Sequence, residues 1–145
     1  MQRLCQGTRW VLRLADGEDL IATLADFARS EGIRAGFVVS AIGGIGRATL
    51  GYWTGTEYAA RPLAGFHELV GLAGSVAVAD GKPSVHLHAS LGEASHGVVG
   101  GHLLDARVQN LVELYLETFP GHTFGRPMDE SLGLRVLDLA PGPNL

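Results

Sequence analysis

Residues 84–91 read Ser84-Val85-His86-Leu87-His88-Ala89-Ser90-Leu91 and alternate strictly between polar and apolar side chains. This alternation predicts a β-strand, because successive side chains of a strand point to opposite faces of the sheet. One face then carries the polar residues, His86, His88 and Ser90. The other face carries Val85, Leu87, Ala89 and Leu91 and is expected to lie against a hydrophobic core.

Most of the chain outside this stretch has the same character. Eight segments, counting residues 84–91, predict strands because they alternate or are rich in β-branched residues. They are Trp10–Ala15, Gly36–Ala41, Thr49–Trp53, Glu68–Ala79, Ser84–Leu91, Val98–Leu104, Val108–Phe119 and Leu132–Leu139. Residues 108–119 could also line a helix, but their Val, Tyr and Phe content favours a strand. Gly81-Lys82-Pro83 predicts a hairpin turn, and Pro141-Gly142-Pro143 is expected to end the ordered fold.

Only the segment from Glu18 to Glu31 predicts a helix. Its apolar residues recur at spacings of three and four; they are Leu20, Leu24, Phe27 and Ala28. Asp16 fits the N-cap, and Gly32 fits the left-handed position after the last turn. Many strands with short connections and one helix predict an α+β fold, a largely antiparallel sheet with one main covering helix. We expect a single domain over residues 1–145 with a tail over 141–145, and another subunit against the open sheet face.

The composition indicates a soluble, cytoplasmic protein. Of the 145 residues 46% are hydrophobic and 18% are charged, and no apolar run approaches the ~18 residues of a membrane span. The first residues lack the apolar core of a signal peptide. The single Cys5 excludes an intramolecular disulfide and a cysteine-rich zinc site. A net charge of −4 weighs against autonomous nucleic-acid binding, although the scattered arginines leave a local patch open.

His86 and His88 are the most informative residues for chemistry. Strand positions two apart have Cα atoms about 6.5–7 Å apart, so both imidazoles can reach one metal ion. Gly100-Gly101 allows a close approach of the next strand, where His102 can lie opposite or diagonal to the pair. Three neutral imidazoles would leave one coordination position open, as in catalytic zinc sites. Zinc is the favoured ion, Fe, Mn or Ni fit the same ligands, and a hydrogen-bonded seam without metal is the alternative.

Glu68 and Glu113 are the carboxylates expected near these histidines. Each lies inside a strand pattern among apolar neighbours, where an unpaired charge would be costly. Either could be a fourth ligand, orient a histidine, or act as a general base. An ion pair with an arginine is the alternative for both. The remaining histidines, His67, His96 and His122, lie near predicted turns and are expected to face solvent.

Two glycine-containing motifs do not support a function. Gly43-Gly44-Ile45-Gly46 lacks the spacing of a phosphate-binding loop and precedes strand-like sequence, so a simple turn is expected. Gly125-Arg126-Pro127 is the core tripeptide of an AT-hook, which binds A·T-rich minor grooves. Phe124 and Met128 flank it, however, where further Arg and Lys would be needed. The sequence has no candidate for covalent catalysis.

Three stretches together resemble the PPC domain (plant and prokaryote conserved domain). They are Gly65–Gly74, Gly81–Leu91 with its His-Leu-His, and Val98–Leu104 with Gly-Gly-His-Leu-Leu. The resemblance covers nearly the whole chain and implies an α+β fold and a homotrimer. It also implies a provisional label of DNA-binding protein, inherited from plant members that carry a separate AT-hook, which this chain lacks.

The chain departs from the family pattern at two places. Phe66-His67 precede Glu68 where the family usually has Arg and Phe, and Ser75 follows Gly74 where it usually has Asn. Partner contacts of the plant proteins are therefore not carried over. The fold is also similar to that of acetolactate decarboxylase, a zinc enzyme whose metal is held by a strand-borne His-x-His and a third histidine. That similarity is one of fold, and function must be argued from the site.

Two functions follow as hypotheses. The first is a trimeric accessory or regulatory module, labelled DNA-binding, that carries a three-histidine metal site. The second is a small metal-dependent enzyme of lyase or hydrolase type, or a small-molecule-binding protein, that uses His86, His88 and His102.

Overall fold

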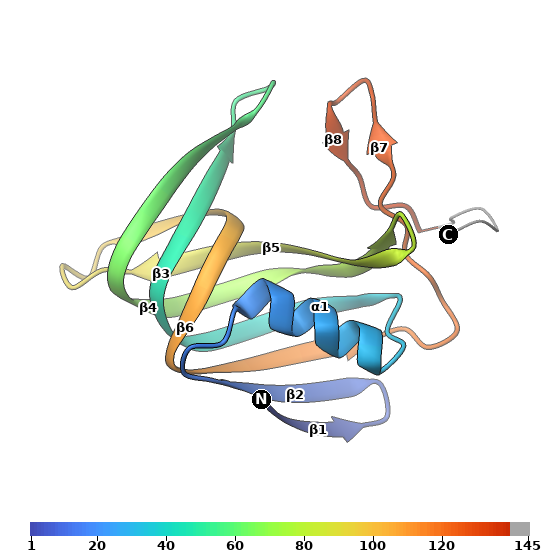
Figure 1. The fold of residues 1–145 in the computed structure, drawn as a ribbon, viewed down its shortest axis with the longest axis horizontal. Coiled ribbons are helices and arrows are strands. Elements are labelled where there is room, and N and C mark those ends of the chain that lie inside the picture. The colour runs from blue at the N-terminus through green and yellow to red at the C-terminus, as the bar shows by residue number, and fades with distance from the viewer. Residues whose placement is uncertain (140–145) are drawn as a thin grey trace.

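The computed structural model describes residues 1–139, and strands make up most of it (Figure 1). The elements in chain order are β1 (Gln2–Gln6), β2 (Arg9–Ala15), α1 (Leu20–Ser30), β3 (Gly36–Trp53), β4 (Tyr58–Ala79), β5 (Lys82–Gly92), β6 (Val98–Thr118), β7 (Met128–Asp129) and β8 (Leu134–Arg135). The predicted α+β fold, with one helix and a largely antiparallel sheet, is confirmed. The expected tail over 141–145, with Pro141-Gly142-Pro143, lies outside the described residues.

The main sheet curls back on itself. Its six strands follow the order β1-β2-β6-β3-β4-β5, and every neighbouring pair is antiparallel. The last strand, β5, also pairs with the first residues of β6, from Val98 to His102. The edge strand β5 therefore pairs with β6, a strand from the middle of the sheet. The two strands that carry the histidines become direct neighbours.

Several predicted strand boundaries are wrong. Residues 43–46 do not form a turn but continue β3, with irregular register between Gly43 and Ile45 and between Ile45 and Arg47. A bulge takes up an extra residue and bends a strand without ending its ladder. Gly43 fits this bend, because a Cβ there would lie 2.2 Å from the carbonyl oxygen of Leu111. The strands expected over 98–104 and 108–119 are one strand, β6, and the strand expected over 132–139 is reduced to β8.

The helix is shorter at its start than predicted. Its N-cap is Asp19, whose carboxylate accepts a hydrogen bond from the Ala22 amide at 2.9 Å. Asp16 instead accepts from the Asn110 amide at 2.8 Å and ties the preceding loop to β6. Gly32 has a φ of 66° and occupies the left-handed position as expected. The helix is too short to cross a membrane, and no other helix occurs in residues 1–139.

The hydrophobic core lies between α1 and the concave side of the sheet. The predicted helix face, Leu20, Leu24, Phe27 and Ala28, is buried, and α1 packs against β5 and β6. From β5, the core receives Leu87, Ala89 and Leu91, while His88 on the opposite face is exposed. The alternation of residues 84–91 therefore has the predicted orientation. Burying the apolar face fixes the direction in which the histidines point.

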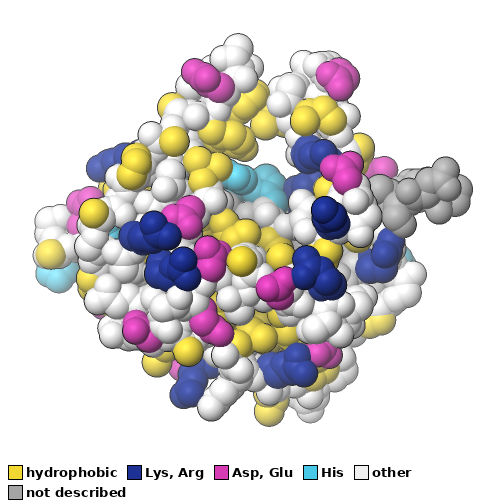
Figure 2. All heavy atoms as spheres, in the orientation of Figure 1, with side chains coloured by type: hydrophobic (Ala, Val, Ile, Leu, Met, Phe, Trp, Pro, Cys, Tyr) yellow, Lys and Arg dark blue, Asp and Glu magenta, His cyan; other side chains and the backbone are white. Residues whose placement is uncertain are grey.

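After β6 the chain returns alongside the end of β4. The Val78 amide donates to the Phe124 carbonyl at 2.8 Å, and the Arg126 amide donates to the Val78 carbonyl at 2.9 Å. Phe124 is buried against Ala35 and Ala77, so this segment is firmly attached. The short β7–β8 hairpin that follows projects beside the tip of the long β3–β4 hairpin (Figure 1). A notch with histidine side chains at its floor lies between the two projections (Figure 2).

Candidate metal centre

Two adjacent strands bring three histidines together. His86 and His88 lie on one face of β5, and His102 on β6 is paired in register with His88. One ring nitrogen from each residue can be chosen so that all three lie within 4.8 Å of one another. His86 Nε2 and His88 Nε2 are 3.2 Å apart. The predicted cluster is therefore present.

The arrangement fits a small metal ion. Three atoms that all lie within 4.8 Å of one another have a common point no farther than about 2.8 Å from each, close to the roughly 2.0–2.1 Å of a zinc–nitrogen bond. His102 Nδ1 is also buried without a hydrogen-bond partner, and a buried polar atom of this kind is costly unless something binds it. No carboxylate or cysteine among residues 1–139 joins the group of potential ligands.

Close packing on both sides holds the histidines. Gly74 on β4 lies against His86, where an added Cβ would come 1.9 Å from the His86 carbonyl oxygen. Any larger residue would therefore push β5 away from β4. On the other side the ring of Tyr58 stacks on His102 with centroids 4.6 Å apart, and Trp53 packs against Tyr58. His88 remains open to solvent and also borders a hollow of about 510 Å³ formed with β3, β4 and β6.

Arg126 is a site residue that the sequence analysis overlooked. Its side chain is only 5% exposed, and its Nη1 lies 3.0 Å from His86 Nδ1. Its Nη2 donates to Ser75 Oγ at 2.6 Å. Ser75 and His86 are register partners on β4 and β5, so the guanidinium lies over this pair. In the sequence Arg126 stands only at the centre of the Gly125-Arg126-Pro127 tripeptide, and that pattern does not indicate a residue beside the histidines.

The surroundings keep two of the histidines neutral. Burial, reinforced by Arg126, His102 and His88, lowers the pKa of His86 to about 4. Burial, with contributions from His88 and Arg126, also lowers the pKa of His102. Neutral imidazole is the form that binds metals, so protons compete little for these two ligands near pH 7.

The other predicted residues lie away from the cluster. Glu68 and Glu113 are both exposed, and neither is among the potential ligands around His86. Glu68 lies opposite Gly92, four residues along β5 from His88, or about 13 Å. Glu113 lies opposite Arg13 on β2 and Ile42 on β3, eleven residues along β6 from His102.

The expectation for the remaining histidines is partly wrong. His96 and His122 are exposed as predicted, but His67 is 8% exposed. It lies within β4, which begins ten residues earlier than the predicted strand, and its Nδ1 contacts the Gly65 carbonyl oxygen at 2.9 Å. A strand position facing inward, not a turn, explains its burial.

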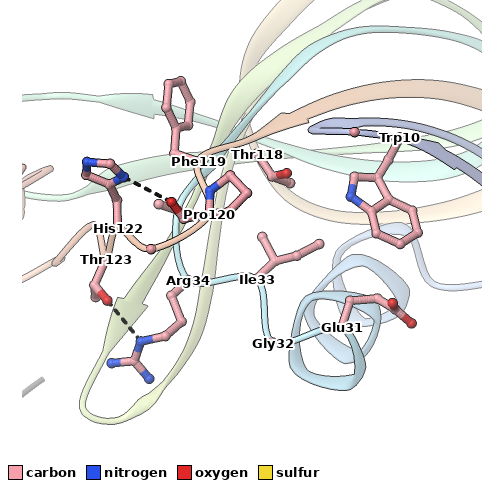
Figure 3. A pocket seen from close by; sticks show the side chains of 13 residues that line it. Trp10, Glu31, Gly32, Ile33, Arg34, Thr118, Phe119, Pro120, His122 and Thr123 are labelled. Carbon is pink, nitrogen blue, oxygen red and sulfur yellow. Dashed lines mark hydrogen bonds between the residues drawn. The ribbon is translucent and has the colours of Figure 1, made fainter.

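A cavity of about 350 Å³ lies elsewhere, between the end of α1 and residues 118–123 (Figure 3). Trp10 and Ile33 form its apolar wall. The Arg34 Nε donates to Thr123 Oγ1 at 3.0 Å, and His122 Nδ1 contacts the Pro120 carbonyl oxygen at 3.3 Å. Glu31 of the same wall pairs with Arg3 outside it. The group of potential metal ligands lies at the notch instead.

The chain is similar to known proteins over most of its length. A family model described as the Plants and Prokaryotes Conserved (PCC) domain matches residues 1–120. A bifunctional protein GlmU from a Synechococcus strain is 35% identical over 133 residues, 90% of this chain. The chain spans about a fifth of the length of that relative, so the match covers one part of a larger protein.

Solved structures share the fold. A metal-containing protein from Archaeoglobus fulgidus is 34% identical, with a TM-score of 0.84 over 91% of this chain and 94% of that one. A protein from Ralstonia eutropha, provisionally named as DNA-binding, is 25% identical, with a TM-score of 0.87 over 95% and 96%. A Staphylococcus aureus protein similar to α-acetolactate decarboxylase has a TM-score of 0.50 at 12% identity, over 76% and 52%. This match supports only the expected similarity in fold to acetolactate decarboxylase.

The lowered pKa of His86 predicts that the metal-free protein loses stability in acid. Unfolded His86 has its ordinary pKa of 6.5, while the folded residue titrates at about 4. Between these values the unfolded chain binds a proton that the folded chain does not, so the free energy of unfolding falls as pH drops from 6.5 to 4. Urea unfolding of the metal-free protein at several pH values measures this fall.

His86→Gln should make that fall shallower, because glutamine does not titrate. His96→Gln, in an exposed loop, is the matched control and should keep the wild-type dependence. Identical slopes for wild type and His86→Gln would contradict the assignment of a buried neutral imidazole at position 86.

Proposed function

The chain belongs to the Plants and Prokaryotes Conserved (PCC) domain family, and we propose that it binds a divalent metal ion through His86, His88 and His102 and takes a small-molecule ligand at that ion. The observation that carries the proposal is the convergence of three ring nitrogens within 4.8 Å. Zinc suits three imidazoles best, while Fe, Mn and Ni accept the same ligands.

The residues around the histidines support a reactive site more than a closed structural one. A structural zinc is normally enclosed by four protein ligands, whereas only three potential ligands gather here among residues 1–139. His88 is exposed, so solvent and ligands can reach the cluster. A divalent ion with an open position supplies Lewis-acid chemistry and lowers the pKa of bound water. The 34% identical Archaeoglobus fulgidus protein is named as metal-containing, which supports the same reading.

We also propose that the chain assembles as a homotrimer, as the family resemblance implies. Apolar side chains on the outer face of the sheet support self-association: Val11, Val39, Ile42 and Val70 are between 48% and 56% exposed. They come from β2, β3 and β4. In the sheet, β2 and β3 are the two neighbours of β6, and β4 is the next strand after β3. The four side chains therefore share one surface. Monomeric proteins seldom leave such a surface in water.

DNA binding is the second candidate, and the name of the 25% identical Ralstonia eutropha protein is the observation that favours it. The charge of this chain opposes it, because a net −4 repels phosphates. Basic and acidic side chains are interspersed on the face shown in Figure 2. The arginine of the Gly125-Arg126-Pro127 tripeptide is buried and cannot enter a minor groove. A small molecule is therefore the better-supported ligand.

Metal analysis tests the main proposal. Protein purified without a nickel column, incubated with zinc and dialysed, should retain about one ion per chain. His88→Ala should reduce zinc to background and leave the circular dichroism spectrum unchanged, because His88 is exposed and the core side chains Leu87 and Ala89 are untouched. His96→Ala should retain zinc like wild type. Wild-type protein that retains no metal, or His88→Ala that retains it fully, would show that the cluster is a polar seam.

Light scattering at micromolar concentration tests the assembly. The expected mass is about three times 15.3 kDa. Ile42→Asp should lower the mass by placing a charge in the apolar surface. Leu132→Asp, at an exposed apolar residue in the β7–β8 turn, should not. A monomeric wild type would refute the trimer.

An anisotropy titration with labelled duplexes, one of them A·T-rich, tests the second candidate. Near physiological salt, binding should be no tighter than the ~10⁻⁴–10⁻⁶ M of non-specific contact. Nanomolar, sequence-selective binding by the isolated protein would reverse the ranking of the two functions.

A further inference from the structure

Arg126 is a buried cation without a negative partner among the described residues. Its side chain is 5% exposed, and none of the ion pairs within residues 1–139 includes it. The neighbouring Arg135 pairs with Asp80. A buried guanidinium is costly unless an anion and hydrogen-bond acceptors compensate it. Here its neighbours are a neutral imidazole and a hydroxyl.

The hydrogen bonds of Arg126 are also incomplete. Its Nη2 donates to Ser75 Oγ and its Nη1 contacts His86 Nδ1, while its Nε is buried with no partner. The Nη1 contact is favourable only when His86 Nδ1 is an acceptor, because arginine has no acceptor of its own. The ring proton of His86 then lies on Nε2, directed at His88 Nε2, 3.2 Å away.

This proton position conflicts with metal binding by His86 and His88 through the same two atoms. His86 can coordinate through Nε2 only when its proton has moved to Nδ1, where it would face the N–H groups of Arg126. Coordination therefore removes the acceptor from Nη1, so that neither Nε nor Nη1 has one, and Nη2 has a second N–H besides the one that it donates to Ser75. A carboxylate offers two oxygens in the spacing of a guanidinium fork, which Nη2 forms with Nη1 or with Nε.

We propose that Arg126 binds a small organic carboxylate and holds it beside the three histidines. The part of this inference that concerns the metal ion rests on the proposed function, whereas carboxylate binding by Arg126 does not depend on a metal. A monoanion fits better than a phosphate, because only one cationic side chain contacts the histidine cluster within the described residues. The stacked rings of Tyr58 and His102, with Trp53 behind them, provide an apolar wall for the organic part of the ligand.

The scaffold around Arg126 resembles a built binding site rather than a chance burial. Backbone hydrogen bonds to Val78 hold the segment on one side, and Gly125 exchanges two backbone hydrogen bonds with Asp138 on the other. Arg135 Nη1 also donates to the Arg126 carbonyl oxygen at 3.0 Å. The guanidinium is thus fixed before any ligand arrives, which reduces the ordering cost of binding.

Two titrations test the proposal, one without metal and one with it. In the metal-free protein, acetate should raise the thermal midpoint in a saturable way, whereas acetamide, its neutral isostere, should not. In cobalt-loaded protein, acetate should perturb the visible bands of the ion and bind at least tenfold more tightly than in the metal-free form. Linkage requires that acetate tighten cobalt binding by the same factor.

Arg126→Gln should weaken acetate binding at least tenfold in both forms and remain folded, because it removes a buried charge that lacks a partner. Arg61→Gln, which removes the same charge from an exposed position on β4, should bind acetate like wild type. Equal acetate affinity in wild type and Arg126→Gln would overturn the proposal, and so would tighter binding of inorganic phosphate than of acetate. If cobalt does not bind, the metal proposal fails alone, because the metal-free titration still decides whether Arg126 binds the carboxylate.

Discussion

The pairing of β5 with both β4 and β6 is the constraint on which the site depends. Through β4, it places His86 beside Ser75, and through β6 it places His88 opposite His102. A flat six-stranded sheet in the same order would leave β5 at a free edge, three strands away from β6. The curl that brings them together is made by long strands that bend at bulges. One of these bends depends on Gly43, which lets β3 pass close to Leu111.

The alternation of polar and apolar residues along β5 places buried side chains on one face of the strand and the histidines on the other. Leu87, Ala89 and Leu91 are each at most 3% exposed, and a shift of register by one residue would exchange them with the histidines at a large free-energy cost. The hydrophobic core therefore aims the imidazoles and keeps them in place.

The polar side of the site is unusual in its charge balance. Two half-buried neutral imidazoles and a buried guanidinium lie together, and the described residues supply no carboxylate to compensate them. A metal ion alone would add further positive charge. An anionic ligand would compensate the positive charge of a divalent ion and an arginine at a site whose histidines are neutral. This is a reason to search for the ligand among small carboxylates before nucleic acids.

The sequence by itself determined the local features of this protein: the alternating strand of residues 84–91, the apolar helix face with Gly32 at its end, and the histidines that share one strand face. These features depend on the period of a strand or helix and on single-residue conformation, which neighbours along the chain decide. The sequence also indicated that His102 belongs with His86 and His88, through a glycine pair that permits close approach. The strand boundaries predicted from the sequence were wrong, as were the exposure expected for His67 and the position of Glu68 and Glu113 near the histidines. Bulges and strand length depend on pairing partners far along the chain. Only the tertiary structure decided that Arg126, forty residues after His86, lies over that imidazole. Its position follows from backbone hydrogen bonds between residues 124–126 and Val78, and no pattern of neighbouring residues encodes a contact of that range.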